Sequence, residues 1–216
     1  MKVLVTGANG FIGSEVCRVA VEGGHSVVGL ARRGRPHGAG SWAAEVEWVA
    51  GDVLEPAGWR SHLAGCDAVI HCVGIIREDV RRGATFERVN GDSAITAAEE
   101  AERAGVGAFV FVSASAKPPL VGEGYILGKR RAERRIQELG LRAVILRPGF
   151  VYGAGRLPSL PAAAAMKLAA LLPVVGTAAR ESRPVAVETL AGVALRAAVD
   201  GGVRGVVDVG GIERMV

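Results

Sequence analysis

Cysteine is scarce in this chain, which has three among 216 residues: Cys17, Cys66 and Cys72. An odd number without a regular spacing gives neither a disulfide framework nor a set of metal ligands. We therefore expect no metal site and a reducing, cytoplasmic compartment. Because the first predicted strand begins at residue 2, we also expect no signal or transit peptide.

A strong charge imbalance and a long apolar run are also lacking. The formal net charge is +4, and the arginines are scattered along the chain, so a nucleic-acid partner is not indicated. The densest basic cluster, in residues 130–135, is more typical of a solvated helix face than of a polyanion site. The apolar stretch from Leu157 to Val175 contains prolines and Lys167, which leave too short a run for a transmembrane helix.

What the chain does have is a regular alternation of apolar segments with amphipathic ones. Half of the residues are hydrophobic, enough to bury one substantial core. Alternating strands and helices predict an α/β fold with a doubly wound parallel sheet. Strands are predicted at 2–5, 26–30, 46–49, 68–72, 108–112, 143–146, 184–187 and 205–209, and helices at 15–21, 54–63, 85–104, 123–139, 157–175 and 188–199.

This pattern predicts a dinucleotide-binding Rossmann domain over residues 1–156. A small substrate-side subdomain and a closing strand are expected over 157–216, packed on the same core. The sequence leaves open whether the last strand, at 205–209, joins the edge of the sheet or the subdomain.

The organising stretch runs from Thr6 to Gly13, between the first strand and the first helix. Its glycines suit a tight turn, a close approach of the backbone to a pyrophosphate, and close packing of the helix on the strand. The first-turn N–H groups would then face an anion. A flexible surface turn is the alternative, but the position between a strand and a helix favours nucleotide binding. The predicted cofactor contacts here are Gly7, Asn9, Gly10, Phe11, Ile12 and Gly13.

The second strand ends at Ala31-Arg32-Arg33, where NAD-binding versions of this unit carry an acidic residue for the ribose. Guanidinium groups suit a 2′-phosphate, so NADP is favoured over NAD. The alternative is that Arg32 and Arg33 only solubilise a loop. After the third strand, Asp52 and Val53 are placed to contact the adenine.

Tyr125 and Lys129 lie one helical turn apart on one face of a predicted helix. A nearby ammonium favours the phenolate of a tyrosine, which suits the pair to proton transfer. The same lysine can hold the nicotinamide ribose. Ser115 follows the fifth strand, at the sheet edge where ligands of open α/β sheets bind. His71 and Cys72 are adjacent and point to opposite faces of a strand, so we expect both to be packing residues.

The chain resembles extended or atypical members of the short-chain dehydrogenase/reductase superfamily. The matching segments are residues 6–13, 51–53, 69–72, 89–90, 113–115, 125–129 and 147–153, in family order over about three quarters of the chain. The resemblance implies a catalytic set of Ser115, Tyr125 and Lys129, with Asn90 as a proton-relay residue. It also implies cofactor contacts for Val73, Gly74, Ser113, Lys129, Pro148 and Gly149.

Residues 111–119, continuing to Lys129-Arg130, resemble more narrowly an atypical branch related to an accessory subunit of respiratory complex I. That branch includes a protein associated with ubiquinone synthesis. The segment between Ser115 and Tyr125 is shorter than in sugar-nucleotide epimerases, and the C-terminal region is small. Both departures argue against a large nucleotide sugar as substrate.

Together these features predict an NADP-dependent oxidoreductase, or an isomerase-like enzyme, acting on a small or lipophilic carbonyl or quinone-type compound. The alternative is a catalytically silent NAD(P)H-binding protein that supports a quinone-related or membrane-associated assembly. The apolar side chains of Leu157–Val175 suit a lipophilic ligand; a cover for the core or for a dimer interface is the other interpretation. The sequence leaves open a peripheral membrane association and does not decide between a monomer and a homodimer.

Overall fold

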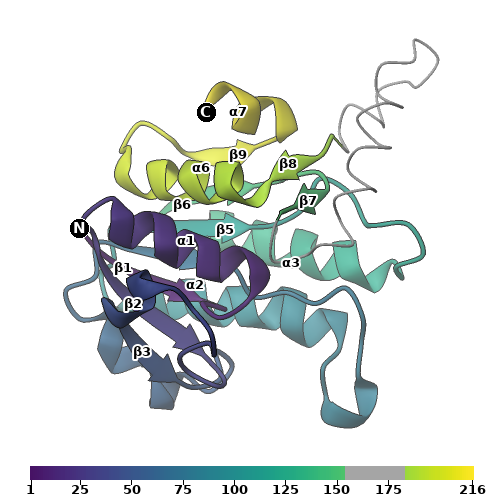
Figure 1. Ribbon diagram of the computed structural model, residues 1–216. Coiled ribbons are helices and arrows are strands. Elements are labelled where there is room, and N and C mark those ends of the chain that lie inside the picture. The colour runs from purple at the N-terminus through teal and green to yellow at the C-terminus, as the bar shows by residue number, and fades with distance from the viewer. Residues whose placement is uncertain (154–182) are drawn as a thin grey trace.

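The computed structural model describes residues 1–153 and 183–216, and its centre is a parallel sheet with the strand order β3-β2-β1-β4-β5-β6-β9 (Figure 1). Because the order reverses beside β1, the sheet is doubly wound, and the predicted fold class is confirmed. Its strands are β1 (Lys2–Thr6), β2 (Ser26–Ala31), β3 (Val46–Ala50), β4 (Ala68–His71), β5 (Ala108–Val112), β6 (Arg142–Leu146) and β9 (Gly205–Val207). A separate parallel pair joins β7 (Val151–Tyr152) to β8 (Val185–Ala186).

Helices cover both faces of the sheet. α1 (Phe11–Glu22) and α6 (Val187–Val199) pack together on one face. α2 (Ser93–Arg103) and α3 (Gly124–Glu138) cover the other. A short helix that the sequence analysis does not predict, α7 (Val209–Arg214), follows β9.

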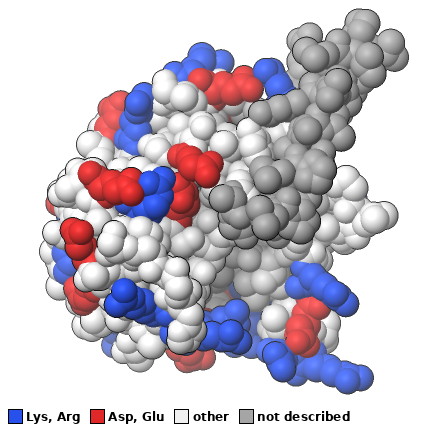
Figure 2. Space-filling model, viewed as in Figure 1, with Lys and Arg blue, Asp and Glu red and all other residues white. Residues whose placement is uncertain are grey.

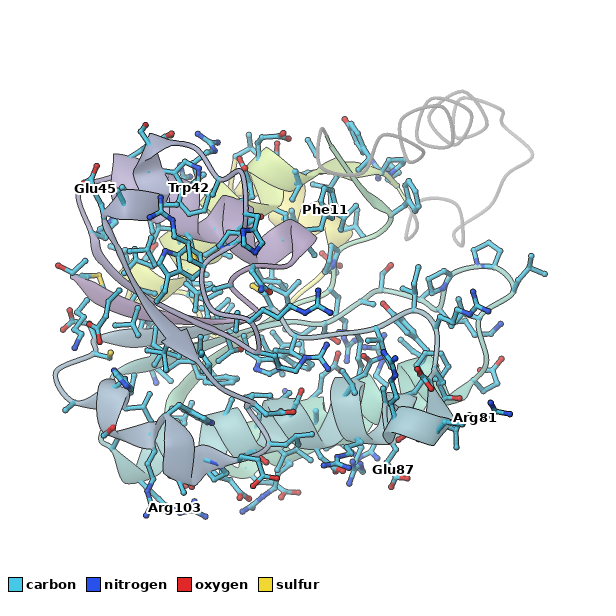
Figure 3. The ribbon with its side chains drawn as sticks, turned by 60° about the horizontal axis from the view of Figure 1, so that its bottom comes forward. Phe11, Trp42, Glu45, Arg81, Glu87 and Arg103 are labelled. Atoms are coloured by element: carbon cyan, nitrogen blue, oxygen red, sulfur yellow. The ribbon has the colours of Figure 1, made fainter. Side chains whose placement is uncertain are left out.

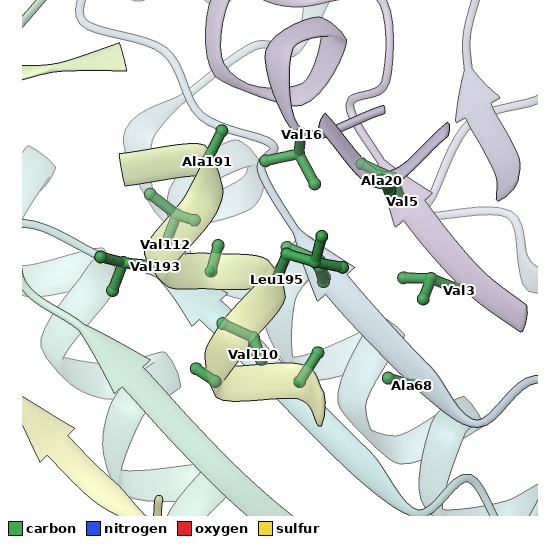
Figure 4. Close-up of a cluster of buried hydrophobic side chains, with 14 of the residues drawn as sticks. Val3, Val5, Val16, Ala20, Ala68, Val110, Val112, Ala191, Val193 and Leu195 are labelled. Carbon is green, nitrogen blue, oxygen red and sulfur yellow. The ribbon is translucent and has the colours of Figure 1, made fainter. Parts of the chain in front are cut away.

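Alternate side chains of each central strand enter the two cores, which explains why these strands are apolar throughout. In β5, Val110 and Val112 face α1 and α6, whereas Phe109 and Phe111 face α2 and α3. Figure 4 shows the first of these cores, in which Val16 of α1 and Ala191 of α6 approach the strands.

The last strand joins the sheet: β9 pairs with β6 and forms the edge. Together with α6 it packs on the same core as the first half of the chain. The segment 157–175 lies outside the described residues, so the substrate-side subdomain stays a prediction. None of the helices within the described ranges is long and apolar enough to cross a bilayer.

The prediction of a helix over 54–63 is wrong, because this segment forms two short 3₁₀ turns, Pro56–Gly58 and Arg60–Leu63. Pro56 lacks an N–H group, and Gly58 is a poor helix former. The buried ring of Trp59 also fixes the chain locally, since its indole nitrogen donates to the carbonyl of Val53 at 3.2 Å.

The helix predicted over 85–104 exists but changes type along its length. A π-helix, Glu87–Asp92, leads into α2 without a break. At the junction the hydroxyl of Ser93 donates to the carbonyl of Val89 at 2.6 Å. Short π segments widen a helix and often occur at functional sites, and this one contains Asn90.

Candidate cofactor and active site

The glycine-rich turn after β1 brings backbone groups together more closely than other residues allow. Gly7 has a φ of +70°, and a Cβ there would lie 3.1 Å from the backbone of Cys72 and Val73. A Cβ on Gly13 would lie only 2.2 Å from the carbonyl oxygen of Gly7. The N-cap of α1, Gly10, makes no side-chain cap hydrogen bond. The turn thus supplies a small-residue cradle at a helix N-terminus, the arrangement that accepts a pyrophosphate.

A cleft of about 180 Å³ opens beside this turn, at the carboxyl ends of β1 to β4. It lies where the strand order reverses, which is the position where open α/β sheets bind ligands. Eight of the predicted cofactor residues line it: Gly7, Asn9, Gly10, Arg32, Asp52, Val53, Val73 and Gly74. The cleft and the cradle therefore fit a dinucleotide cofactor.

Polar side chains shape the walls of this cleft. The carboxylate of Asp52 accepts from the backbone N–H of Leu54 at 3.0 Å, and the amide of Asn9 donates to the carbonyl of Gly34 at 3.4 Å. Both Arg32 and Arg33 are exposed; Arg32 lines the cleft, whereas Arg33 lies outside the lining. Of the two predicted 2′-phosphate contacts, the structure thus brings one directly to the cleft.

The other predicted cofactor residues lie outside this lining. Phe11, Ile12 and Gly13 form the start of α1, where Figure 3 labels Phe11. The remaining ones, Ser113, Lys129, Pro148 and Gly149, belong to the β5, α3 and β6 side of the sheet edge. All of these assignments stay predictions.

On the catalytic side, α3 buries Tyr125 and Lys129 on one face. The ring of Tyr125 packs edge-on against Phe86 with 5.9 Å between ring centroids. The ammonium of Lys129 lies 5.8 Å from the centroid of the Tyr125 ring and donates to the carbonyl of Val112 at 3.0 Å. Burial lowers the pKa of Lys129 to about 8, against an opposing effect of Glu133. Lys129 therefore remains mostly charged at neutral pH.

Ser115 is half-buried, and its backbone is fixed from two sides. Its N–H donates to the carbonyl of Pro148 at 2.9 Å, and its carbonyl accepts from the guanidinium of Arg130 at 2.8 Å. Pro148, a predicted cofactor contact, thus also holds Ser115 in place. The loop after β5 and the loop after β6 are joined at this point.

Asn90 is fully buried, and its side chain holds the loop that follows β4. Its amide oxygen accepts from the N–H of Ile75 at 2.7 Å, and its amide nitrogen donates to the carbonyl of the same residue at 3.0 Å. A Cβ on Gly74 would lie 3.4 Å from the Asn90 oxygen and 3.7 Å from the Lys129 nitrogen. Gly74 therefore marks where the cofactor cleft meets the predicted catalytic residues.

A buried ionic cluster, which the sequence pattern does not predict, lies next to these residues. The carboxylate of Glu133, on α3, accepts from the hydroxyl of Ser113 and from the guanidinium groups of Arg130 and Arg147. Arg130 also donates to the carbonyls of Ala114 and Ser115. Arg130 is thus not on the solvated helix face that its sequence context favours. One signal points to Glu133, because it follows Tyr125 and Lys129 at the same four-residue spacing.

A buried chain of hydrogen bonds through His71 is a second feature that the sequence pattern does not predict. Ser93 already donates to Val89, so its oxygen accepts from Nε2–H of His71 at 3.2 Å. Nδ1 of His71 then accepts from the hydroxyl of Thr6 at 2.8 Å. Burial, together with the charge of Lys129, lowers the pKa of His71 to about 3, so the ring is neutral.

His71 also packs against the rings of Phe109 and Phe111, in keeping with the expectation of a packing residue. Its hydrogen bonds tie the end of β1, directly before the glycine turn, to the start of α2. Among the residues that the structure describes, no group of three or more potential metal ligands occurs.

Comparisons with known proteins agree with this geometry. The model of the NAD dependent epimerase/dehydratase family matches residues 3–185. In sequence, the chain is 34% identical to a ceramide reductase of Caulobacter vibrioides over 182 residues, covering 84% of this chain and 55% of that protein. It is 30% identical to a 2-alkyl-3-oxoalkanoate reductase of Stenotrophomonas maltophilia over 189 residues, covering 74% and 54%.

A third relative is MIOREX complex component 2 of Saccharomyces cerevisiae, 30% identical over 201 residues, with 70% of this chain and 73% of that protein covered. This similarity supports the narrower branch that the sequence resembles. The chain spans about half the length of the two reductases.

A similar solved structure is that of Thermus thermophilus UDP-glucose 4-epimerase with NAD. Its TM-score is 0.72 at 22% identity, over 97% of this chain and 77% of that one, which supports the fold. The match to the family model spans most of the chain. The chain therefore belongs to the NAD-dependent epimerase/dehydratase family.

Proposed function

We propose that the protein reduces a lipophilic carbonyl compound, such as a long-chain ketone or a quinone, with NADPH in the cytoplasm. The observation that carries this proposal is the buried pair of Tyr125 and Lys129 beside the inner end of the cofactor cleft. Two relatives support the substrate class, because their names describe reductases acting on a ceramide and on an alkyl-substituted oxo acid.

The proposed preference for NADPH depends on charge at the end of β2. Arg32 lines the cleft where an acidic residue would accept from the ribose hydroxyls of NADH, and the exposed Arg33 is adjacent to it. A guanidinium at this position favours the 2′-phosphate of NADPH.

In the proposed reaction, the cleft lined by Gly7, Gly10 and Arg32 would hold a reduced nicotinamide cofactor, which would supply a hydride for the carbonyl carbon. The hydroxyl of Tyr125 donates a proton to the carbonyl oxygen, and the carbonyl becomes an alcohol. Lys129, charged at neutral pH, stabilises the phenolate that remains until solvent returns the proton. Ser115, held by Pro148 and Arg130, donates a hydrogen bond to the same oxygen and orients it.

A second candidate function is that of a cofactor-binding protein without turnover in a larger assembly. The observation that favours it is the similarity to a protein named as a component of the MIOREX complex. In that case the cleft would bind NADPH, and the side chains around Tyr125 would serve stability alone.

The two functions are separated by following the absorbance of NADPH with purified protein and a panel of ketones and quinones of increasing chain length. We expect turnover that rises with chain length and that NADH supports less well. Thermal stabilisation by NADPH without consumption across the whole panel would reject the reductase and favour the second candidate.

A further inference from the structure

Two loops at the carboxyl end of the sheet carry apolar side chains that solvent surrounds. Val80, at the tip of the loop 75–86, is 71% exposed, and Leu120, in the loop 116–124, is fully exposed. Ile76, in the first loop, and Leu127, in the first turn of α3 after the second loop, are exposed as well. These four make up half of the large apolar side chains that are exposed in the described ranges. Such clustering marks an interaction site rather than scattered surface residues.

The backbone of both loops is organised to present these side chains. Asp79 pairs with Ala84 in an antiparallel bridge and accepts from the N–H of Arg82, which closes the tip around Val80. Leu120 has a φ of +64°, the one positive φ among the described residues other than glycine. A left-handed conformation is strained for a leucine, and here it directs an apolar side chain into water.

Arginines flank the apolar tip of the first loop, Val80. The segment 76–88 contains Arg77, Arg81, Arg82 and Arg88 and three carboxylates. Two of these carboxylates, on Glu78 and Asp79, accept from backbone N–H groups of the same loop. Figure 3 shows Arg81 at the outer end of the molecule, and Figure 2 shows several basic side chains around an acidic one near the lower right edge.

The bases of both loops meet over Tyr125. Ile75 and Phe86 from the first loop and Val121 from the second belong to one apolar cluster with Tyr125. The bases of the two loops that carry the exposed tips therefore pack together with the predicted catalytic Tyr125.

We propose that this loop surface, formed by Ile76, Val80 and Leu120 with Arg77, Arg81 and Arg82, docks on an anionic lipid bilayer. The apolar tips enter the interface, and the guanidinium groups contact the headgroups. Two separate tips suit a fluid interface that adapts to them, whereas a protein partner requires a matched face. The purpose of docking rests on the proposed function, because a lipophilic carbonyl compound would reach Tyr125 from the bilayer.

The test is co-sedimentation with vesicles of phosphatidylglycerol and phosphatidylcholine in equal parts, compared with phosphatidylcholine alone. It is run without substrate, so its outcome does not depend on turnover. We expect binding to the anionic vesicles that weakens in high salt, and at least fivefold weaker binding to the neutral ones. Val80→Asp with Leu120→Asp, and separately Arg81→Glu with Arg82→Glu, should each weaken anionic binding at least fivefold.

Two matched control variants carry the same kinds of substitution, Val→Asp and Arg→Glu, outside the loop surface. Val199→Asp introduces a charge at an exposed valine at the far end of α6, and Arg134→Glu reverses an exposed arginine on α3. Both should bind anionic vesicles as the unchanged protein does. Thermal stabilisation by NADPH confirms that every variant is folded.

Equal binding by the loop variants and the controls, or no binding to anionic vesicles, would overturn the proposal. Self-association that the loop variants abolish, without vesicle binding, would instead assign the surface to a second copy of the chain. Vesicle binding without any reducible substrate would refute the proposed function and leave the docking surface standing.

Discussion

The carboxyl edge of the sheet has a cofactor half and a catalytic half, and the two are built from different kinds of chemical group. The cofactor half, at the ends of β1 to β4, consists of backbone groups and small residues such as Gly7, Gly10 and Gly13. The catalytic half, around α3, buries charged side chains, among them Lys129 and Glu133. Backbone positions are fixed by local sequence, whereas buried charges depend on partners from distant parts of the chain. Substitutions in the catalytic half should therefore lower the free energy of unfolding, whereas substitutions in the cofactor half should lower cofactor affinity.

The largest effect is expected in the catalytic half. Glu133→Ala leaves the guanidinium groups of Arg130 and Arg147 without their shared carboxylate, and losing one member of a buried ionic cluster costs about 3–5 kcal/mol. Urea denaturation measures this loss. Glu138→Ala, on the exposed end of the same helix, should change the free energy of unfolding by less than about 0.5 kcal/mol. Equal effects of the two changes would mean that the cluster does not stabilise the fold.

In the cofactor half the expected loss is of binding. Gly13→Ala places a methyl group 2.2 Å from the carbonyl of Gly7, so the helix must move away from the turn. We expect NADPH affinity to fall roughly 100-fold, equivalent to about 2.7 kcal/mol. Gly192→Ala, in α6, meets no atom within 4 Å and serves as the control. Isothermal titration with NADPH measures the affinity of both variants. An unchanged affinity in Gly13→Ala would contradict the assignment of the glycine turn as the pyrophosphate cradle.

His71 lies between the two halves, and its titration makes the stability of the fold depend on pH. Its folded pKa of about 3 lies below the unfolded value, so the unfolded chain binds a proton first as pH falls. Stability is thus retained above about pH 6.5 and lost toward pH 3, by up to about 1.4 kcal/mol per pH unit. His71→Gln should reduce this slope, and His37→Gln, on an exposed loop, should keep it. Parallel stability curves for His71→Gln and the unchanged protein would refute a buried neutral ring.

The smallest effect concerns cofactor choice. Arg32→Ala with Arg33→Ala should cost roughly tenfold in NADPH affinity, about 1.4 kcal/mol, and little in NADH affinity. Arg35→Ala, which alters a neighbouring exposed arginine, is the control. Thermal-shift titrations with both cofactors measure the preference. Equal stabilisation by NADPH and NADH in the unchanged protein would remove the basis for NADP.

The same contrast explains what the sequence could predict. The glycine turn, the alternation of strands with helices and the spacing of Tyr125 and Lys129 are local patterns. The structure confirms the doubly wound sheet and buries Tyr125 and Lys129 on one face of α3. The ionic cluster needs the knowledge that Arg147, after β6, lies beside α3. The hydrogen bonds of His71 likewise join residues from β1, β4 and α2. Single-residue context also misled the helix prediction at 54–63, where Pro56 and the burial of Trp59 decide the backbone.

The most direct test of the account is the rate of NADPH consumption by Tyr125→Phe with the best substrate from the panel. The substitution removes one hydroxyl and keeps the ring that packs against Phe86. We expect kcat to fall at least about 100-fold, because proton transfer by a positioned side chain contributes about that much, while NADPH affinity stays within about twofold. Near-full activity in Tyr125→Phe would contradict the assignment of Tyr125 as the proton donor.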